Sequence, residues 1–270
     1  MMDAYGAHAH EQCARALYGD LAAAIGRIFD KLQLPVYRVE APAGDMGGSV
    51  SHEWQLRACA GEDRLRVCAD CGHARLALPS TGGGERCPRC GGHTDTLNSI
   101  EVGHTFMLGA RYSRPLLAAY TAPGGGSEPL HMTCYGIGIT RLLAAGVEAL
   151  SSESHLRWPA HVAPCSAVLV GPKEGSKEWL SHSDMIEQVY RQLDAVPALR
   201  GDVLVDDRHH LTIGKRLLMA DRLGCPLVVV LGKSVSSGQV EVYRAGADGQ
   251  LQPELMTLEQ LTQKPLAVVN

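Results

Sequence analysis

Apolar residues in the first half of the chain follow two different periods. From Glu11 to Leu32 they recur about every 3.6 residues, which predicts an amphipathic helix that ends before Pro35. In other segments apolar and polar residues alternate, as they do in a half-buried strand. The predicted strands cover residues 36–41, 49–54, 100–113, where the strand gives way to a loop, and 130–135.

The strand after Gly47 and Gly48 has a definite two-sided pattern. Its alternation puts one set of side chains on one face, namely Ser49, Ser51 and Glu53, and a second set on the other face, namely Val50, His52 and Trp54. A histidine and a tryptophan in such a strand are more often part of a core than of a site.

Residues 130–150 change from strand period to helix period across a glycine turn. Gly136 and Gly138 allow a tight turn and a close approach of the backbone to a ligand. Arg141 then falls in the first helical turn, where its guanidinium and the free amides can face an anion together. This arrangement predicts a phosphate site, with a solvated arginine as the alternative.

After a proline-containing linker at 151–164, short β-branched runs alternate with helical segments. Such a pattern predicts a small α/β domain with a buried, largely parallel sheet. The expected strands are 167–170, 203–205, 227–231 and 240–243, and the expected helices are about 173–193 and 213–223.

Composition narrows the possible partners. Of the 270 residues 45% are hydrophobic and 20% charged, which allows a substantial core and two domains. The formal net charge of −4 gives no general basic field, so any contact with RNA must be local. No apolar run approaches the length that spans a membrane, and we expect no membrane partner.

Four cysteines form two CxxC pairs, Cys68 with Cys71 and Cys87 with Cys90, separated by fifteen residues. Two such knuckles can bring four thiolates around one tetrahedral zinc ion. Four thiolates leave no open position for water, so the predicted zinc is structural. Two disulfides are the alternative, although nothing in the sequence points to secretion.

The string CYGIGITRLLAA resembles the third motif of the class II aminoacyl-tRNA synthetases, and MMDAYGAHAH resembles the end of the second. Together with the strings that follow, in order along the chain, they resemble one family of that class, the prolyl-tRNA synthetases. GGSVSHEW, IEVGHTFMLGARYS and RWPAHVAP resemble further family strings, with Trp54 in place of a phenylalanine. The segment VLVDDRHHLTIGKRLLMADRLGCPLVVVLGK resembles the family's anticodon-binding domain.

The resemblance implies a fold and a division of the chain. We expect an α+β class II catalytic domain, an antiparallel sheet with helices, at residues 1–155, with a zinc-ribbon-like insert at 66–93. A small α/β anticodon-binding domain is expected at 156–270. The family's first motif and most of the second have no counterpart here, so we expect the chain to be the C-terminal part of a longer synthetase, inactive if it occurs alone.

The resemblance also implies site residues. For ATP they are Glu101, Gly103, His104, Gly136, Gly138 and Arg141, with Arg141 as the catalytic residue and Glu101 also suited to Mg²⁺. For proline they are Asp3, Tyr5, His52 and Trp54. For the tRNA anticodon they are Asp207, Arg208, Lys215 and Arg216, with solvated helix charges as the alternative for the last two.

The implied activity is proline–tRNA ligation in mitochondrial translation, since the likeness is strongest to the mitochondrial branch. Proline and ATP would form prolyl-adenylate, and the prolyl group would pass to tRNA(Pro). We expect no editing domain in the short segment between Leu56 and Ile100, a homodimer in the full-length form, and a location in the mitochondrial matrix. The alternatives are a non-catalytic tRNA-binding or regulatory fragment and a related ligase for threonine, histidine or glycine.

Overall fold

Alternating segments in the first half of the chain form one antiparallel sheet in the structure, a computed structural model that describes residues 1–77, 86–159, 161–245 and 251–263. The chain divides into two units, Met1–Ala149 and Leu150–Asn270. Among the described residues, no helix has the length and apolar character needed to cross a membrane.

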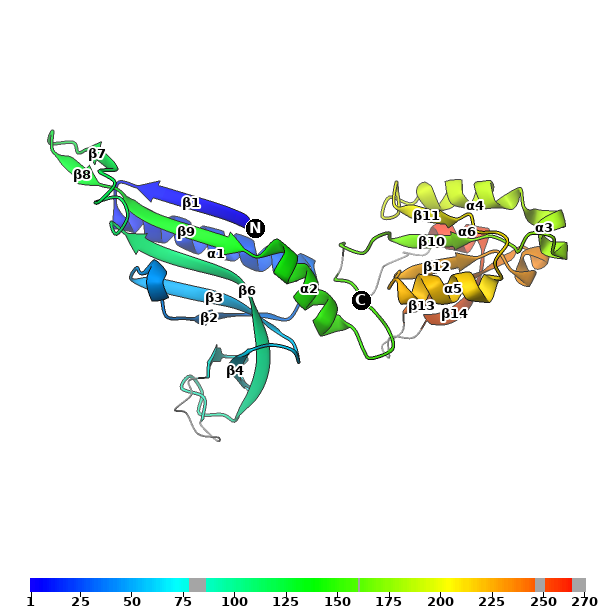
Figure 1. The fold of residues 1–270 in the computed structure, drawn as a ribbon, viewed down its shortest axis with the longest axis horizontal. Helices are drawn as coiled ribbons and strands as arrows, with labels where there is room; N and C mark the ends of the chain where they lie inside the picture. Colours follow the sequence, from blue (N-terminus) through cyan, green and yellow to red (C-terminus); the bar gives the residue numbers. More distant parts are fainter. Residues whose placement is uncertain (78–85, 160, 246–250, 264–270) are drawn as a thin grey trace. The chain divides into compact units, whose positions relative to one another are not determined.

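The sheet of the first unit contains seven strands (Figure 1). Its main path runs β1 (Met2–His8), β9 (His131–Ile137), β6 (Thr94–Gly109), β3 (Val50–Arg57) and β2 (Val36–Glu40). β4 (Asp63–Cys68) pairs with the first part of β6, and β5 (Ala74–Leu76) pairs with β4. Three smaller elements complete the connections: the 3-10 turn η1 (Gly44–Met46) and the hairpin of β7 (Ala119–Thr121) and β8 (Ser127–Pro129).

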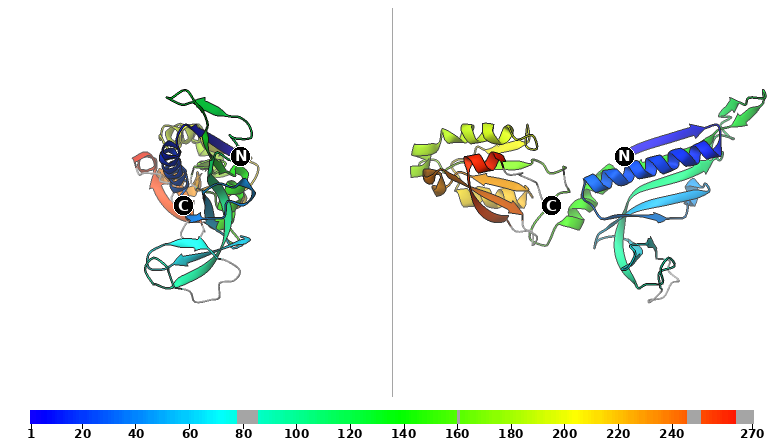
Figure 2. Two further views of the ribbon diagram at one scale, coloured as in Figure 1. Left: turned by 90° about the vertical axis from the view of Figure 1, so that its left-hand side faces the viewer. Right: turned by 180° about the vertical axis from the view of Figure 1, so that it is seen from behind.

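One face of this sheet is covered by the helix α1 (Glu11–Lys31), as the right-hand view of Figure 2 shows. The buried side chains of the helix recur at helical spacing and include Tyr18, Ile25 and Phe29. The prediction of an amphipathic helix ending before Pro35 is therefore confirmed. The strand β1, which the sequence analysis did not predict, forms one edge of the main path.

A second helix, α2 (Ile139–Leu150), follows β9 directly. The connection contains Gly138, whose carbonyl accepts the first helical hydrogen bond, from the amide of Leu142 at 2.7 Å. The predicted sequence of strand, glycine turn and helix is confirmed at this point.

The zinc-ribbon-like insert emerges from a hairpin of the main sheet. β3 ends at Arg57, which lies opposite Ser99 in β6, so the segment between them leaves and rejoins the sheet on neighbouring strands. Residues 78–85 of the predicted insert lie outside the described residues.

The second unit contains a five-stranded sheet in the order β11 (Val203–Asp206), β10 (Ala167–Val170), β12 (Leu227–Val230), β13 (Gln239–Ala245) and β14 (Leu251–Thr257). The first three strands are parallel, whereas β13 and β14 are antiparallel, so the sheet is mixed. The sequence analysis missed β14 and predicted a more parallel sheet.

Two cores cover the two faces of this second sheet. One core joins the sheet to α4 (Met185–Asp194) and α6 (Leu258–Gln263), through Val189, Leu193 and Leu261. The other joins it to α5 (Ile213–Arg222), through Ala220 and the partly buried Leu217. The 3-10 turn η2 (Lys233–Ser237) links β12 to β13.

The helix predicted at about 173–193 is two helices, α3 (Lys177–His182) and α4. Ser176 caps α3 by accepting a hydrogen bond from the amide of Trp179, which sets a later start than expected. Ser183 and Asp184 separate the two helices, and both residue types compete with the helical backbone for hydrogen bonds.

Candidate active site

The helix α1 packs against one face of the sheet of the first unit and does not cover the other face. Residues paired directly across antiparallel strands share a face. One row of residues on this other face therefore crosses four strands. It runs from Glu53 to His104, then to Gly136 and Asp3, each paired with the next. The next row on that face contains Ser51, Phe106, Cys134 and Tyr5. We call this the open face.

Histidine 104 is fixed on the open face by three neighbours. Its Nε2 lies 2.6 Å from the Ser51 hydroxyl, and its Nδ1 lies 3.5 Å from a Glu101 carboxylate oxygen. The imidazole also stacks on Phe106 with ring centroids 4.0 Å apart. These contacts hold the ring beside Glu101 before any ligand binds.

The pKa values of the two glutamates beside His104 are shifted in opposite directions. Hydrogen bonding to His104 lowers the pKa of Glu101, whereas burial, together with the nearby Glu101 charge, raises the pKa of Glu53. Ligand atoms of Glu53, Glu101 and His104 all lie within 4.8 Å of one another. A bound cation would relieve the repulsion between the two carboxylates, so this donor set fits a divalent metal.

A cavity of about 210 Å³ adjoins this cluster. All six residues predicted to bind ATP line it: Glu101, Gly103, His104, Gly136, Gly138 and Arg141. Residues far apart in sequence thus meet because β6 and β9 are neighbours and α2 begins at their ends.

Two features of the cavity suit an anionic ligand. Arg141 is exposed, and its Nη1 donates a hydrogen bond to the carbonyl of Glu101 at 3.1 Å, which leaves further guanidinium donors free for a phosphate. Gly136 keeps this side of the cavity open, because a Cβ there would lie 3.2 Å from Cε of Met1, which lines the cavity, and 3.4 Å from an Asp3 carboxylate oxygen. The amino terminus of α2 adds amides with a partial positive charge.

The four residues predicted to bind proline do not lie together. Asp3 and Tyr5 are exposed on the open face. His52 and Trp54 lie on the other face, where Trp54 is 6% exposed and packs on Phe29 of α1 with ring centroids 5.4 Å apart.

His52 is held on the covered face as well. Its Nδ1 lies 2.8 Å from the hydroxyl of Tyr18 in α1, and burial and the positive charge of Arg38 lower its pKa. The prediction that His52 and Trp54 share a pocket with Asp3 is therefore wrong. Strand alternation already separated them from Ser51 and Glu53, which are the residues of β3 on the open face.

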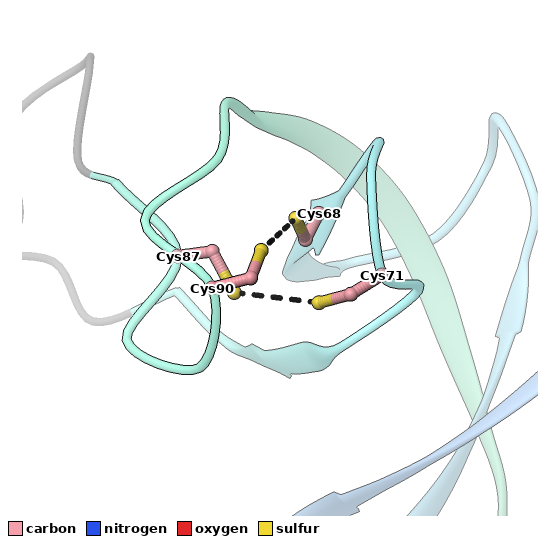
Figure 3. Close-up of side chains that lie close together, drawn as sticks. All are labelled: Cys68, Cys71, Cys87 and Cys90. Carbon is pink, nitrogen blue, oxygen red and sulfur yellow. Dashed lines mark hydrogen bonds between the residues drawn. The ribbon is translucent and has the colours of Figure 1, made fainter.

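The four cysteines of the insert converge (Figure 3). The sulfur of Cys68 lies 3.5 Å from that of Cys90, and the sulfur of Cys71 lies 3.7 Å from that of Cys87, so each knuckle faces the other. Desolvation tends to raise the pKa of Cys87, but the backbone amides of Cys90 and Arg89 lower it to about 7. Four sulfurs within 4.8 Å of one another fit a single tetrahedral ion.

The predicted anticodon residues divide between surface and core. Asp207 and Lys215 are exposed and Arg208 is half-buried. Arg216 is 0% exposed and donates to the carbonyls of Gly171 at 2.6 Å and of Pro172 and Asp206 at 3.2 Å. The prediction that Arg216 contacts RNA is wrong, because the side chain is buried and its Nη1 and Nη2 donate to backbone carbonyls inside the unit.

Asp206, which the sequence analysis did not assign to a site, forms an ion pair beside the predicted anticodon residues. Its carboxylate pairs with Arg208 at 2.6 Å. Burial opposes ionisation, yet the hydrogen bonds from Arg208 outweigh it and lower the pKa of Asp206. The pair fixes the Arg208 guanidinium at the carboxyl end of β11.

Known proteins resemble the chain in sequence and in fold. A family profile described as "Anticodon binding domain" matches residues 167–264. A Homo sapiens protein named probable proline–tRNA ligase, mitochondrial, is 43% identical over 234 residues, which are 86% of this chain and 49% of that protein. The Schizosaccharomyces pombe counterpart is 33% identical, over 86% of this chain and 54% of its own.

More distant relatives extend the match. Proline–tRNA ligase of Ehrlichia ruminantium is 31% identical over 96% of this chain and 62% of its own. The solved structure of Giardia lamblia prolyl-tRNA synthetase in complex with prolyl-adenylate superposes with a TM-score of 0.73 at 19% identity, covering 97% of this chain and 45% of that one. The chain spans about half the length of the curated mammalian relatives that it matches.

Proposed function

The chain belongs to the prolyl-tRNA synthetase family, and from this membership we propose that it supplies the ATP-binding face and the tRNA-binding domain of a proline–tRNA ligase. Its fold is that of a class II catalytic domain followed by an anticodon-binding domain. The observation that carries the proposal is the single cavity lined by Arg141, Glu101, His104 and three glycines.

The proposed reaction begins with activation of the amino acid. The proline carboxylate attacks the α-phosphorus of ATP, pyrophosphate leaves, and prolyl-adenylate forms. Arg141 and the amino terminus of α2 would pair with phosphate oxygens and stabilise their charge in the transition state. No enzyme nucleophile is required, so positioning and charge neutralisation are the contributions that the site has to make.

The amino acid is expected on the open face beside the cavity. The exposed Asp3 carboxylate can pair with the secondary ammonium group of proline. Tyr5, which is exposed in the row that also contains the buried Phe106 and Cys134, offers an adjacent aromatic ring. The aromatic ring of Trp54 instead supports this face from behind, through its contact with α1.

A magnesium ion would be held by Glu101, with Glu53 and His104 close enough to share it. When bound, the ion neutralises phosphate charge. Without it, Glu101 and Glu53 repel each other, and the hydrogen bond from Gln55 to Glu53 at 2.8 Å offsets only part of that repulsion.

We propose a structural zinc ion at Cys68, Cys71, Cys87 and Cys90. The support is the convergence of four sulfurs from two knuckles. Zinc content measured by mass spectrometry on metal-replete protein should be one ion per chain. Double replacement of Cys71 and Cys90 by serine should abolish it, whereas serine at the exposed Cys13 and Cys59 should leave it unchanged.

The second unit would bind the anticodon arm of tRNA(Pro) through Asp207, Arg208 and Lys215, which are accessible at the carboxyl end of β11 and the start of α5. We propose a mitochondrial location because the matching mammalian relatives are named mitochondrial proline–tRNA ligases. Homodimerisation is a further proposal, tested by light scattering.

The test of activity is proline-dependent exchange of label between pyrophosphate and ATP, with threonine, histidine and glycine as controls. Exchange with proline alone would support the proposed ligase. Exchange with another amino acid would overturn the substrate assignment. Absence of exchange, together with absence of ATP binding by a folded chain, would overturn the assignment of the cavity.

A further inference from the structure

Two buried cysteines of the second unit lie side by side. The sulfurs of Cys165 and Cys225 are 3.7 Å apart, and the residues are 7% and 1% exposed. Each precedes a strand of the sheet, β10 for Cys165 and β12 for Cys225. These strands are parallel neighbours with Val168 opposite Val228, and each cysteine stands three residues before its member of that pair.

This pair differs from the four cysteines of the first unit. Among the described residues, groups of three or more potential metal ligands occur at the zinc-type cluster and at Glu53, Glu101 and His104, and neither group includes Cys165 or Cys225. The surroundings of the pair are aliphatic, formed by side chains such as Val168, Ala220 and Val228. A structural zinc site needs four ligands, whereas this apolar core holds two thiols, which can form a disulfide with each other.

We propose that Cys165 and Cys225 form a reversible disulfide when the protein meets a hydroperoxide. In the first step the Cys165 thiolate attacks the peroxide, which gives a sulfenic acid and releases hydroxide or alcohol. In the second step the Cys225 sulfur attacks that sulfenic acid, the S–S bond forms, and water leaves. Each cycle oxidises two thiols and reduces one peroxide, and a dithiol reductant reverses it.

The two sulfurs are not equivalent, which assigns their roles. A hydrogen bond from the neighbouring thiol lowers the pKa of Cys165, and the same contact raises the pKa of Cys225. Cys165 is also the more exposed of the two residues, at 7% against 1%, so a peroxide has better access to it. The thiolate is the reactive form of cysteine, and we therefore assign Cys165 as the attacking residue and Cys225 as the resolving one.

The bond would fasten a segment that already lies against the end of α5. Arg157 pairs with Asp221 at 3.1 Å, and the indole nitrogen of Trp158 donates to the carbonyl of Leu223 at 2.8 Å. Gly224, at φ +71°, leaves room for a backbone contact with Leu156 that a Cβ would prevent. A disulfide between Cys165 and Cys225 would hold this segment against α5 covalently until the disulfide is reduced.

The experiment treats the folded 270-residue chain with hydrogen peroxide, blocks remaining thiols under denaturing conditions, and maps peptides by mass spectrometry. We expect a peptide pair joined through Cys165 and Cys225, about 2 Da lighter than the sum of its thiols. Dithiothreitol should release it. A rise in the melting temperature of about 5 °C or more should accompany the crosslink, because it constrains the unfolded chain.

Matched variants separate the two steps. Cys225→Ala should accumulate a sulfenic acid at Cys165 that dimedone traps, whereas Cys165→Ala should give neither adduct nor crosslink. The double variant C13A/C59A removes two exposed thiols and should retain the crosslink. The proposal is overturned if both buried cysteines are recovered alkylated while exposed cysteines oxidise, or if the link forms only in urea. Neither outcome depends on the ligase activity.

Discussion

Two connections between a strand and a helix carry an arginine in the first helical turn, and the structure uses them in opposite ways. After β9, Arg141 is exposed at a cavity and contacts one carbonyl, that of Glu101. After β11, Arg216 is fully buried and donates to three backbone carbonyls. The sequence analysis assigned Arg141 to the ATP site and Arg216 to the tRNA anticodon site, with a solvated charge as the alternative for each.

The difference arises from helix position and from the strands nearby. Arg141 is the third residue of α2 and Arg216 the fourth of α5, and successive helical positions point about 100° apart. The carboxyl ends of β10 and β11 present free carbonyls to α5, which a guanidinium can satisfy. An arginine in a first turn therefore identifies an anion site only where the neighbouring backbone leaves its donors free.

The largest expected effect is on the buried arginine. Replacing Arg216 by methionine keeps much of the volume but leaves three carbonyls without their donor, so the free energy of unfolding should fall by about 3 kcal/mol. Urea unfolding followed by far-UV circular dichroism measures it. A loss below about 0.5 kcal/mol would show that the carbonyls find other partners.

The exposed arginine should show the reverse pattern. Arg141→Ala should weaken binding of ATP by about 10- to 100-fold, the range for a lost charge-assisted hydrogen bond, while the free energy of unfolding stays nearly unchanged. Calorimetric titration with ATP and Mg²⁺ checks the first part. Arg141→Lys is the matched control, and it should recover part of the affinity because the charge remains. Unchanged affinity in Arg141→Ala would remove Arg141 from the site.

The acid beside the buried arginine gives a pH-dependent effect. Since the folded pKa of Asp206 is lowered by Arg208, despite burial, ionised Asp206 stabilises the fold above its unfolded pKa of about 4. This contribution is lost as pH falls through the folded pKa. The stability difference between the parent and Arg208→Met should therefore be larger at pH 6 than at pH 3, as measured by urea unfolding. Equal differences at both values would contradict the assigned pairing.

The smallest effect is expected at Lys215, the exposed neighbour of Arg216. Lys215→Ala should change the free energy of unfolding by no more than about 0.5 kcal/mol. If Lys215 meets a phosphate, the slope of log affinity for tRNA(Pro) against log salt concentration should fall by about one. An unaltered slope would leave Lys215 a solvated helix charge, which was the alternative interpretation of the sequence.

Local patterns predicted the cavity well because its residues occur in contiguous strings. Glu101, Gly103 and His104 lie on one strand, and Gly136, Gly138 and Arg141 on one turn, so adjacency of two elements was enough to join them. The class II fold with a following anticodon-binding domain was likewise predicted and is confirmed. The cysteine spacing predicted the convergence of sulfurs, and occupancy by zinc stays a prediction.

The errors have different causes, and in one of them the sequence already held the answer. His52 and Trp54 were assigned to the proline pocket with their string, whereas strand alternation sends them to the face that α1 covers. Arg216 was misassigned because its acceptors, the carbonyls of Gly171 and Pro172, lie on a different strand end. The strand β14 was missed, since its pairing with β13 is non-local information.

The cysteine-bearing segment connects two adjacent strands, β3 and β6, and can be exchanged for another segment at this position. Because Arg57 and Ser99 face each other on adjacent strands, whatever is spliced between them starts and finishes at the same place. A tight two-residue turn, a reporter protein or a larger catalytic module could replace the ribbon without rerouting any strand that lines the cavity. One insertion or deletion at this point therefore exchanges the segment as a unit, which makes it a defined position for engineering.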